Sequence, residues 1–231
     1  MPFPRYELLG PLGAGLVIAF LVISLGIHEA AHGWVAWKRG DPTAKDLGRI
    51  TLNPLPHIDP IMTILLPLLL LATTGFVFGG ARPVPVNAAR LKKPLRDMML
   101  VALAGPLSNV CLAIVFLAAY KVFVKYGLYA NAADTLVARQ SQLLPLVLSA
   151  TVLFNVLLAV FNMVPIPPLD GSRVMAWLLP AQLRESYVGL ERIGMILIFF
   201  LIFGVPAFQR ILWEGMLVVY EFAEFATGWI I

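Results

Sequence analysis

The chain has 231 residues, of which 60% are hydrophobic and only 13% are charged, and its formal net charge is +4. Because soluble domains carry about 25% charged residues, this composition excludes an ordinary soluble protein and predicts an all-α polytopic membrane protein. The basic residues cluster between apolar runs, which is typical of cytoplasmic loops and argues against a nucleic-acid partner. With Cys111 as the single cysteine, an intrachain disulfide is excluded.

The first predicted helix covers residues 9–37 and carries the sequence His28-Glu29-Ala30-Ala31-His32. Positions i and i+4 of a helix lie on the same face, so His28 and His32 can offer two imidazole nitrogens to one zinc ion. The carboxylate of Glu29 can then reach a water molecule as the general base of hydrolysis. This pattern requires a third ligand from elsewhere in the chain.

A polar loop at residues 40–60 contains the last histidine, His57. We expect His57 to bond to Asp59 or to the backbone, with a role at a functional site as the alternative. Residues 61–81 are uncharged and long enough to cross a membrane, for which about 20 apolar residues suffice.

A short β element is predicted near residues 82–87. Pro83 and Pro85 lack N–H groups on one edge of this strand, whereas the edge formed by Val84 and Val86 keeps its donors. We therefore expect the Val84 and Val86 edge to capture an extended substrate segment by strand addition. Replacing Val84 by proline should then impair turnover without removing zinc.

Four further apolar segments follow. Residues 98–120 form a span in which Gly105 and Asn109 are interpreted as helix-packing devices. The run 140–169 is uncharged, residues 174–187 are amphipathic and interfacial, and residues 193–206 form a shorter span. The last segment, 208–231, carries three glutamates on one helical face, to which we assign a packing or interfacial role: Glu214, Glu221 and Glu224. These segments predict about 5–6 transmembrane helices in a single domain, 1–231, with a catalytic core at about 9–180 and C-terminal helices at about 188–231.

The third metal ligand is predicted to be Asp170. It directly follows a stretch with Pro165, Pro167 and Pro168, where a membrane helix must stop. An unpaired carboxylate at the bilayer centre costs about 2.5–3.5 kcal/mol on insertion scales, and a metal ion would offset that cost. Irregular backbone at this depth is tolerated only where it is buried or lines a watery cavity.

This assignment constrains the topology. His32 and Asp170 both lie at the C-terminal ends of their helices, so the two helices must run parallel and an odd number of crossings must separate them. Residues 98–120 supply one crossing, so we expect 61–81 to be re-entrant or otherwise not to cross. The basic segments 38–49 and 82–96 then both lie in the cytoplasm, which places the site toward the cytoplasmic face.

The two motifs resemble those of the site-2 proteases, the intramembrane zinc metalloproteases. That family combines H-E-x-x-H with N-x-x-P-x-P-x-L-D-G, and both patterns are intact here, the second from Asn162 to Gly171. The resemblance covers residues 10–180 and suggests a compact prokaryotic type without a PDZ or CBS module. It implies one zinc ion per chain, cleavage of transmembrane-helix substrates in a bacterial cytoplasmic membrane, and a role for Asn162 in holding the substrate or the oxyanion.

A membrane carrier or sensor of zinc without peptidase activity is the alternative. Transporters often have repeated halves and ligands accessible from two sides. The chain has no visible internal repeat, and a glutamate directly beside the ligands is better explained by hydrolysis. The sequence predicts neither the identity of the substrate, nor the activating signal, nor the oligomeric state.

Overall fold

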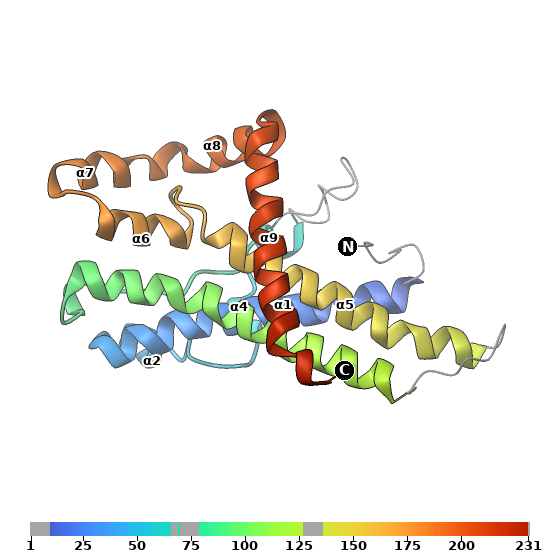
Figure 1. The fold of residues 1–231 in the computed structure, drawn as a ribbon. Coiled ribbons are helices and arrows are strands. Elements are labelled where there is room, and N and C mark those ends of the chain that lie inside the picture. The colour runs from blue at the N-terminus through green and yellow to red at the C-terminus, as the bar shows by residue number, and fades with distance from the viewer. Residues whose placement is uncertain (1–9, 66–68, 70–78, 127–135, 231) are drawn as a thin grey trace.

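The computed structural model describes residues 10–65, 69, 79–126 and 136–230, and the regular structure within these ranges is helical (Figure 1). The α-helices are α1 (Gly10–Arg39), α2 (Thr43–Asp46), α4 (Pro94–Lys125), α5 (Leu136–Asn162), α6 (Asp170–Leu178), α7 (Ala181–Gly189), α8 (Glu191–Gly204) and α9 (Pro206–Ala226). Shorter helical turns lie at Leu55–His57, Pro60–Leu65, Ala88–Arg90 and Gly228–Ile230. The prediction of an all-α protein is confirmed.

The predicted number of membrane spans is too high for the described residues. Three helices are long and apolar enough to cross: Gly15–Arg39, Pro94–Lys125 and Leu143–Asn162. A fourth span is formed only if α7 and α8, which bend by 71° at their junction, count as one. At about 1.5 Å per residue, the 14 residues of α8 extend only about 21 Å, which is shorter than a hydrocarbon core of about 30 Å. Helix α9 is long enough, but it carries four charged side chains: Arg210, Glu214, Glu221 and Glu224.

The predicted short β element near 82–87 is wrong. These residues form no strand, and no strand occurs elsewhere in the described part of the chain. The backbone groups of this segment have partners other than a second strand. Val84 N–H donates to Glu29 Oε2 at 2.8 Å, and Arg49 Nη2 donates to the Arg82 carbonyl at 2.8 Å.

Most of segment 61–81 lies outside the described residues, so its failure to cross stays a prediction. Its two ends, however, meet. Gly80 N–H donates to the Met62 carbonyl at 3.0 Å, and Thr63 Oγ1 donates to the Gly80 carbonyl at 2.6 Å. The described ends of this segment therefore lie side by side.

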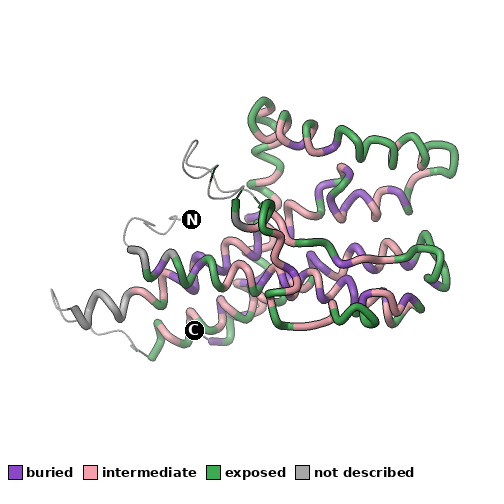
Figure 2. Tube along the Cα trace, turned by 180° about the vertical axis from the view of Figure 1, so that it is seen from behind, coloured by how far each residue is buried: buried purple, intermediate pink, exposed green. Residues whose placement is uncertain are grey.

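Helices α1, α4 and α5 lie side by side and form the centre of the fold, with α1 and α5 running in one direction and α4 in the opposite one (Figure 1). Their buried residues follow the faces where the helices meet (Figure 2). Helix α9 crosses this layer and joins it in one apolar cluster of Ala113, Leu117, Val152, Val156, Met216 and Ala223. Asp170 begins α6 and does not end α5 as expected, but the parallel course of α1 and α5 still brings the start of α6 to the histidine end of α1.

The turn between α5 and α6 is held from two sides. Gly171 lies so close to the backbone of Met163 that a Cβ atom would overlap with it, and Gly194 of α8 packs in the same way against the carbonyl of Pro167. Val164, Leu169 and Ile198 form a buried apolar cluster at this place. The turn is therefore rigidly placed, and Asp170, the first residue of α6, is fixed with it.

Asp41 fastens the C-terminal end of α1 to the chain before α4. Its carboxylate accepts hydrogen bonds from Thr43 N–H and Thr43 Oγ1, and from Asn87 N–H at 2.6 Å. Burial by itself raises the pKa of Asp41, but these hydrogen bonds and the nearby Arg90 guanidinium hold the pKa below its usual range. The side chain is thus an ionised anchor that joins loop 40–50 to the segment after residue 82.

Candidate metal centre

Three side chains from two helices converge on one point. The distances are 3.1 Å between the Nε2 atoms of His28 and His32, 3.2 Å from His28 Nε2 to Asp170 Oδ2, and 3.3 Å from His32 Nε2 to Asp170 Oδ2. Tetrahedral zinc with ligand bonds of about 2.0–2.1 Å separates its ligand atoms by about 3.3–3.4 Å. The cluster therefore has the dimensions of three corners of a zinc tetrahedron, as predicted from the sequence.

Hydrogen bonds fix which nitrogen of each histidine faces the cluster. His32 Nδ1 lies 2.7 Å from the Val101 carbonyl, and His28 Nδ1 lies 2.6 Å from Asn109 Oδ1. Both partners are acceptors, so each Nδ1 carries the proton and each Nε2 presents its lone pair. The Oδ2 atom of Asp170 is buried without a hydrogen-bond donor, and it presents a third lone pair to the cluster. Three lone pairs that meet in a buried place repel one another, and a divalent cation is the group that this donor set fits.

The partner of His28 belongs to a chain of buried polar groups. Asn109 Nδ2 donates to Asn155 Oδ1 at 2.9 Å, and Asn155 Nδ2 donates to Ser24 Oγ at 3.0 Å and to the Thr151 carbonyl at 2.9 Å. The chain links α1, α4 and α5 and orients the Asn109 oxygen toward His28. The sequence predicts a packing role for Asn109 and indicates no role for Asn155, Ser24 and Thr151. The sequence does contain a signal for this network. An amide in the middle of an uncharged run is expected to be buried, and a buried amide needs a hydrogen-bond partner.

Replacing Asn109 by leucine is expected to weaken zinc binding by about 10–100-fold, the usual effect of losing a group that orients a metal-binding histidine. The affinity is measured by competition with a chromogenic chelator. Ser108→Ala is the matched control, because Ser108 Oγ donates only to the carbonyl of Gly105 in its own helix at 2.7 Å. Equal zinc affinity in Asn109→Leu and the control would refute the orienting role.

Helix α4 reaches the histidines because it has glycine at position 105. A Cβ atom there would lie 2.5 Å from His32 Nε2 and 2.6 Å from His28 Cε1. Real Cβ atoms essentially never approach other heavy atoms this closely. The α4 backbone thus forms one wall of the metal centre, which is more specific than the general packing role expected from the sequence.

Glu29 follows His28 in α1 and is not one of the three clustered side chains, and its role as a general base stays a prediction. Its Oε2 atom accepts the Val84 N–H at 2.8 Å. Val84 therefore lies at the site, but the structure gives its backbone donor a different partner from the predicted substrate strand. Val86 follows on the same segment and is half-buried.

The remaining candidates do not join the cluster. The Asn162 amide donates to the Leu158 carbonyl of its own helix at 3.0 Å. His57 is buried, and its Nε2 atom lies 3.3 Å from the Thr51 carbonyl, which is the backbone contact expected. Burial and the charge of Arg49 lower the pKa of His57, although its bond to Thr51 acts in the opposite direction. A neutral His57 is thus a packed loop residue.

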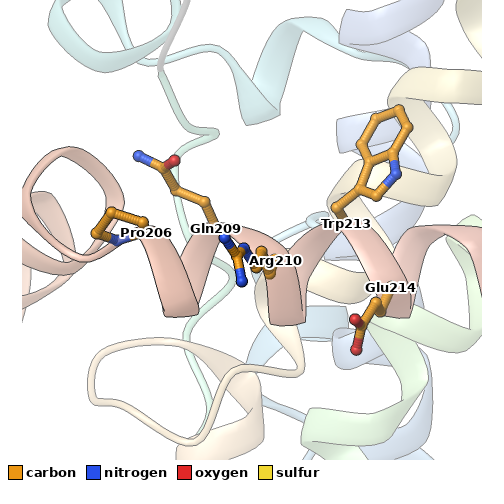
Figure 3. Close-up of a pocket in the computed structure, with 5 residues that line it drawn as sticks. All are labelled: Pro206, Gln209, Arg210, Trp213 and Glu214. Atoms are coloured by element: carbon orange, nitrogen blue, oxygen red, sulfur yellow. The ribbon is translucent and has the colours of Figure 1, made fainter.

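The C-terminal glutamates also lie apart from the metal centre. Glu224 pairs with Lys121 of α4 at 2.6 Å and accepts the Tyr220 hydroxyl at 2.8 Å, a packing role that fits the expectation. Glu221 is exposed, and Glu214 lines a pocket of about 540 Å³ along α9 (Figure 3). The other residues that line this pocket are Pro206, Gln209, Arg210 and Trp213. None of the triad residues contributes to it.

Comparison with known proteins gives a consistent result. The family model described as "Peptidase family M50" matches residues 16–205. "Putative zinc metalloprotease YwhC" of Bacillus subtilis is 39% identical over 197 residues, which cover 85% of this chain and 84% of that protein. "Putative zinc metalloprotease Rip2" of Mycolicibacterium smegmatis is 30% identical over 213 residues, which cover 91% of this chain and 74% of that protein. No solved structure matches the chain.

Proposed function

Because the chain belongs to peptidase family M50, the site-2 protease family, we propose that it hydrolyses peptide bonds within or near transmembrane helices of other membrane proteins. The observation that carries this proposal is the triad of His28, His32 and Asp170 with Glu29 beside it. A site for zinc transport or sensing needs the ligands alone. A carboxylate that is held beside them without being one of them is what hydrolysis adds.

The residues of the site would have separate roles in hydrolysis. His28, His32 and Asp170 would hold one zinc ion, which when bound supplies a Lewis acid that polarises a carbonyl and makes water more acidic. Glu29 has its Oε2 atom on the Val84 N–H, so Oε1 is the oxygen that accepts the proton of the attacking water. The same carboxyl group then returns the proton to the leaving nitrogen. We retain Asn162 as a candidate for holding the substrate or the oxyanion, which requires its amide to leave the Leu158 carbonyl.

The proposed substrate is a transmembrane helix that unwinds locally, because the peptide bonds of an intact helix are hydrogen-bonded and shielded. Since Val84 N–H is engaged by Glu29, strand addition would rest on the carbonyl of Val84 and on the backbone of Val86. Val84→Pro therefore no longer isolates substrate capture, because it also removes a contact of Glu29.

We propose that the site faces the cytoplasmic side of a bacterial membrane. The N–H of Lys92 donates to the carbonyl of Arg39 at 3.1 Å, which joins the basic segments 38–49 and 82–96 at one end of the molecule. Basic residues near the ends of membrane spans accumulate on the cytoplasmic side.

Glu29→Gln is expected to retain zinc and to lose activity by about 10²–10⁴-fold, the range associated with general acid–base catalysis. Wild type and variant are purified in detergent, their zinc content is measured, and each is incubated with a panel of single transmembrane-helix substrates. Cleavage by the wild type alone, at equal zinc content, supports the proposal. Wild type that binds zinc, cuts no helix and moves zinc into proteoliposomes would instead identify a carrier.

A further inference from the structure

We propose that Arg49 is a positioning residue for the catalytic base, acting through the backbone of the loop Arg82-Pro83-Val84. This inference rests on the proposed function, because it assigns Glu29 the role of base. It is carried by a closed ring of contacts that begins on α1 at Glu29 and returns to α1 at Gly33. Arg49 is the member of the ring that closes it.

The first contact joins the loop to Glu29. Val84 N–H donates to Glu29 Oε2 at 2.8 Å, and the side chain of Val84 is only 8% exposed. That side chain packs on Gly33, one turn after Glu29, where a Cβ atom would lie 3.1 Å from Val84 Cγ1. The loop thus touches the same face of α1 twice, through its backbone at Glu29 and through its side chain at Gly33.

The second contact holds the loop from the opposite side. Arg49 Nη2 donates to the Arg82 carbonyl at 2.8 Å and lies 3.4 Å from the Pro83 carbonyl. Pro83 and Pro85 have no N–H, so this segment has more backbone acceptors than donors and can use a partner rich in donors. The planar guanidinium group provides such donors in a fixed geometry. Arg82 N–H donates to the His57 carbonyl at 2.8 Å and gives the loop a third point of attachment.

The third contact anchors Arg49 itself. Its N–H donates to the carbonyl of Ala44 at 2.8 Å, and Ala44 is fully buried. The Ala44 side chain packs against Gly33, where a Cβ atom would lie 3.0 Å from it. The ring therefore runs from Glu29 through Val84, the Arg82 and Pro83 carbonyls, Arg49 and Ala44 back to Gly33.

Within the described ranges, the side-chain hydrogen bonds of Arg49 go to backbone carbonyls. No carboxylate lies within ion-pair distance of it there, and its Nε atom is buried without a partner. Arg49 is half-buried, so the cost in free energy falls on its buried Nε–H, which has lost water without gaining another partner. The ring connects this guanidinium group to the carboxylate of Glu29, the proposed base.

The chemistry gives a reason for this arrangement. A glutamate side chain has several rotatable bonds, and a general base must stay within hydrogen-bond reach of the water that it deprotonates. Misplacement by about 1 Å can cost about 10²-fold in rate. The loop holds Glu29 Oε2 on the backbone N–H of Val84. Because one oxygen of the carboxylate is held, the position of the other oxygen, Oε1, is fixed as well.

The test compares Arg49→Gln with Arg49→Lys, with Lys92→Gln as the matched control. Lys92 is an exposed cation at the same end of the molecule, so its loss reproduces the change in charge alone. The full-length protein is used, and the zinc content of each variant reports whether the fold and the metal centre are intact. Two quantities are then measured: amide hydrogen exchange at Val84, and kcat and KM on a helix substrate cut by the wild type.

Arg49→Gln should exchange the Val84 amide at least about 10-fold faster, because local opening sets protection of such an amide, and should lower kcat by about 10–100-fold. Zinc content should stay within about 2-fold of the wild type, since binding the metal is not the task of the clamp. Any rise in KM should be smaller than the fall in kcat, because the proposed substrate contacts of Val84 and Val86 lie on the same loop. Arg49→Lys, which keeps the charge and some donors, should recover part of both effects, and Lys92→Gln should match the wild type. A variant with lost zinc or a raised KM alone would point to a structural role and overturn the inference.

The two hypotheses can fail separately. Unchanged exchange at Val84 in Arg49→Gln overturns the clamp, whether or not the wild type cleaves helices. Faster exchange with an unchanged kcat shows that the clamp exists but does not position the base, and this also overturns the inference. A wild type that cleaves nothing refutes the proposed function, and the positioning role then falls with it even if the exchange result shows the clamp.

Discussion

Replacing Gly105 by alanine is expected to abolish zinc binding and all hydrolysis while leaving the helices folded. The new methyl carbon would lie 2.5 Å from His32 Nε2, which is a ligand atom, and 2.6 Å from His28 Cε1. Neither ring can turn away cheaply, because each Nδ1 is held by a buried acceptor on α4, Val101 or Asn109. Either the helices α1 and α4 separate or the imidazoles leave the cluster, and both outcomes destroy the triad.

Gly15→Ala is the matched control for this substitution. Gly15 also lies in a helix, α1, but a Cβ atom there would meet nothing within 4 Å. Alanine is a better helix former than glycine by about 1 kcal/mol, so this variant should bind zinc like the wild type. Zinc is quantified after purification, and helical content is measured by circular dichroism. Stoichiometric zinc in Gly105→Ala would show that the α4 backbone does not lie as close to His28 and His32 as the structure indicates.

The sequence was sufficient to predict that His28, His32 and Asp170 come together, because each of them carries a local signal. His28 and His32 are four residues apart on a helix, which brings them together in any tertiary structure. Asp170 follows a proline-rich break inside an apolar run, where a carboxylate is costly without a partner. Their convergence also required α1 and α5 to run parallel, and the structure contains that arrangement (Figure 1).

The contacts around the ligands could not be read from the sequence in the same way. The distance from Gly105 to the histidines and the pairing of Asn109 with Asn155 depend on how two helices pack, which spacing within one helix does not determine. At Val84 the alternation of prolines indicated which edge of the segment keeps its donors. Its partner proved to be Glu29, a side chain 55 residues away in the sequence.

The predicted span count exceeds what the described residues support, for a physical reason that is visible in the C-terminal helices. Hydrophobicity identifies residues that avoid water, but it does not separate a crossing helix from one that packs across other helices. Helix α9 lies across α4 and α5 and pairs Glu224 with Lys121 of α4. Its charged residues are thus partly accommodated by contacts that only the tertiary structure supplies.

Replacing Asp170 by alanine is expected to lower zinc affinity by more than about 100-fold, because loss of a group that merely orients a ligand already costs 10–100-fold. Asp170 Oδ2 is the third corner of the triad, at 3.2 Å and 3.3 Å from the two Nε2 atoms. Two neutral imidazoles then remain without the carboxylate charge that favours a divalent cation. Asp170→Asn should fall between wild type and Asp170→Ala, since an amide oxygen can occupy the same corner without the charge.

Asp46→Ala is the control for Asp170→Ala, because Asp46 is an exposed carboxylate in α2 without a role at the site. Affinity is again measured by chelator competition, together with cleavage of a helix substrate. Since backbone contacts place the start of α6 through Gly171 and Met163, loss of the carboxyl group should leave the turn intact, and thermal unfolding of the zinc-free proteins should be similar. Wild-type zinc affinity in Asp170→Ala would mean that another residue supplies the third ligand, and the metal centre described here would be wrong.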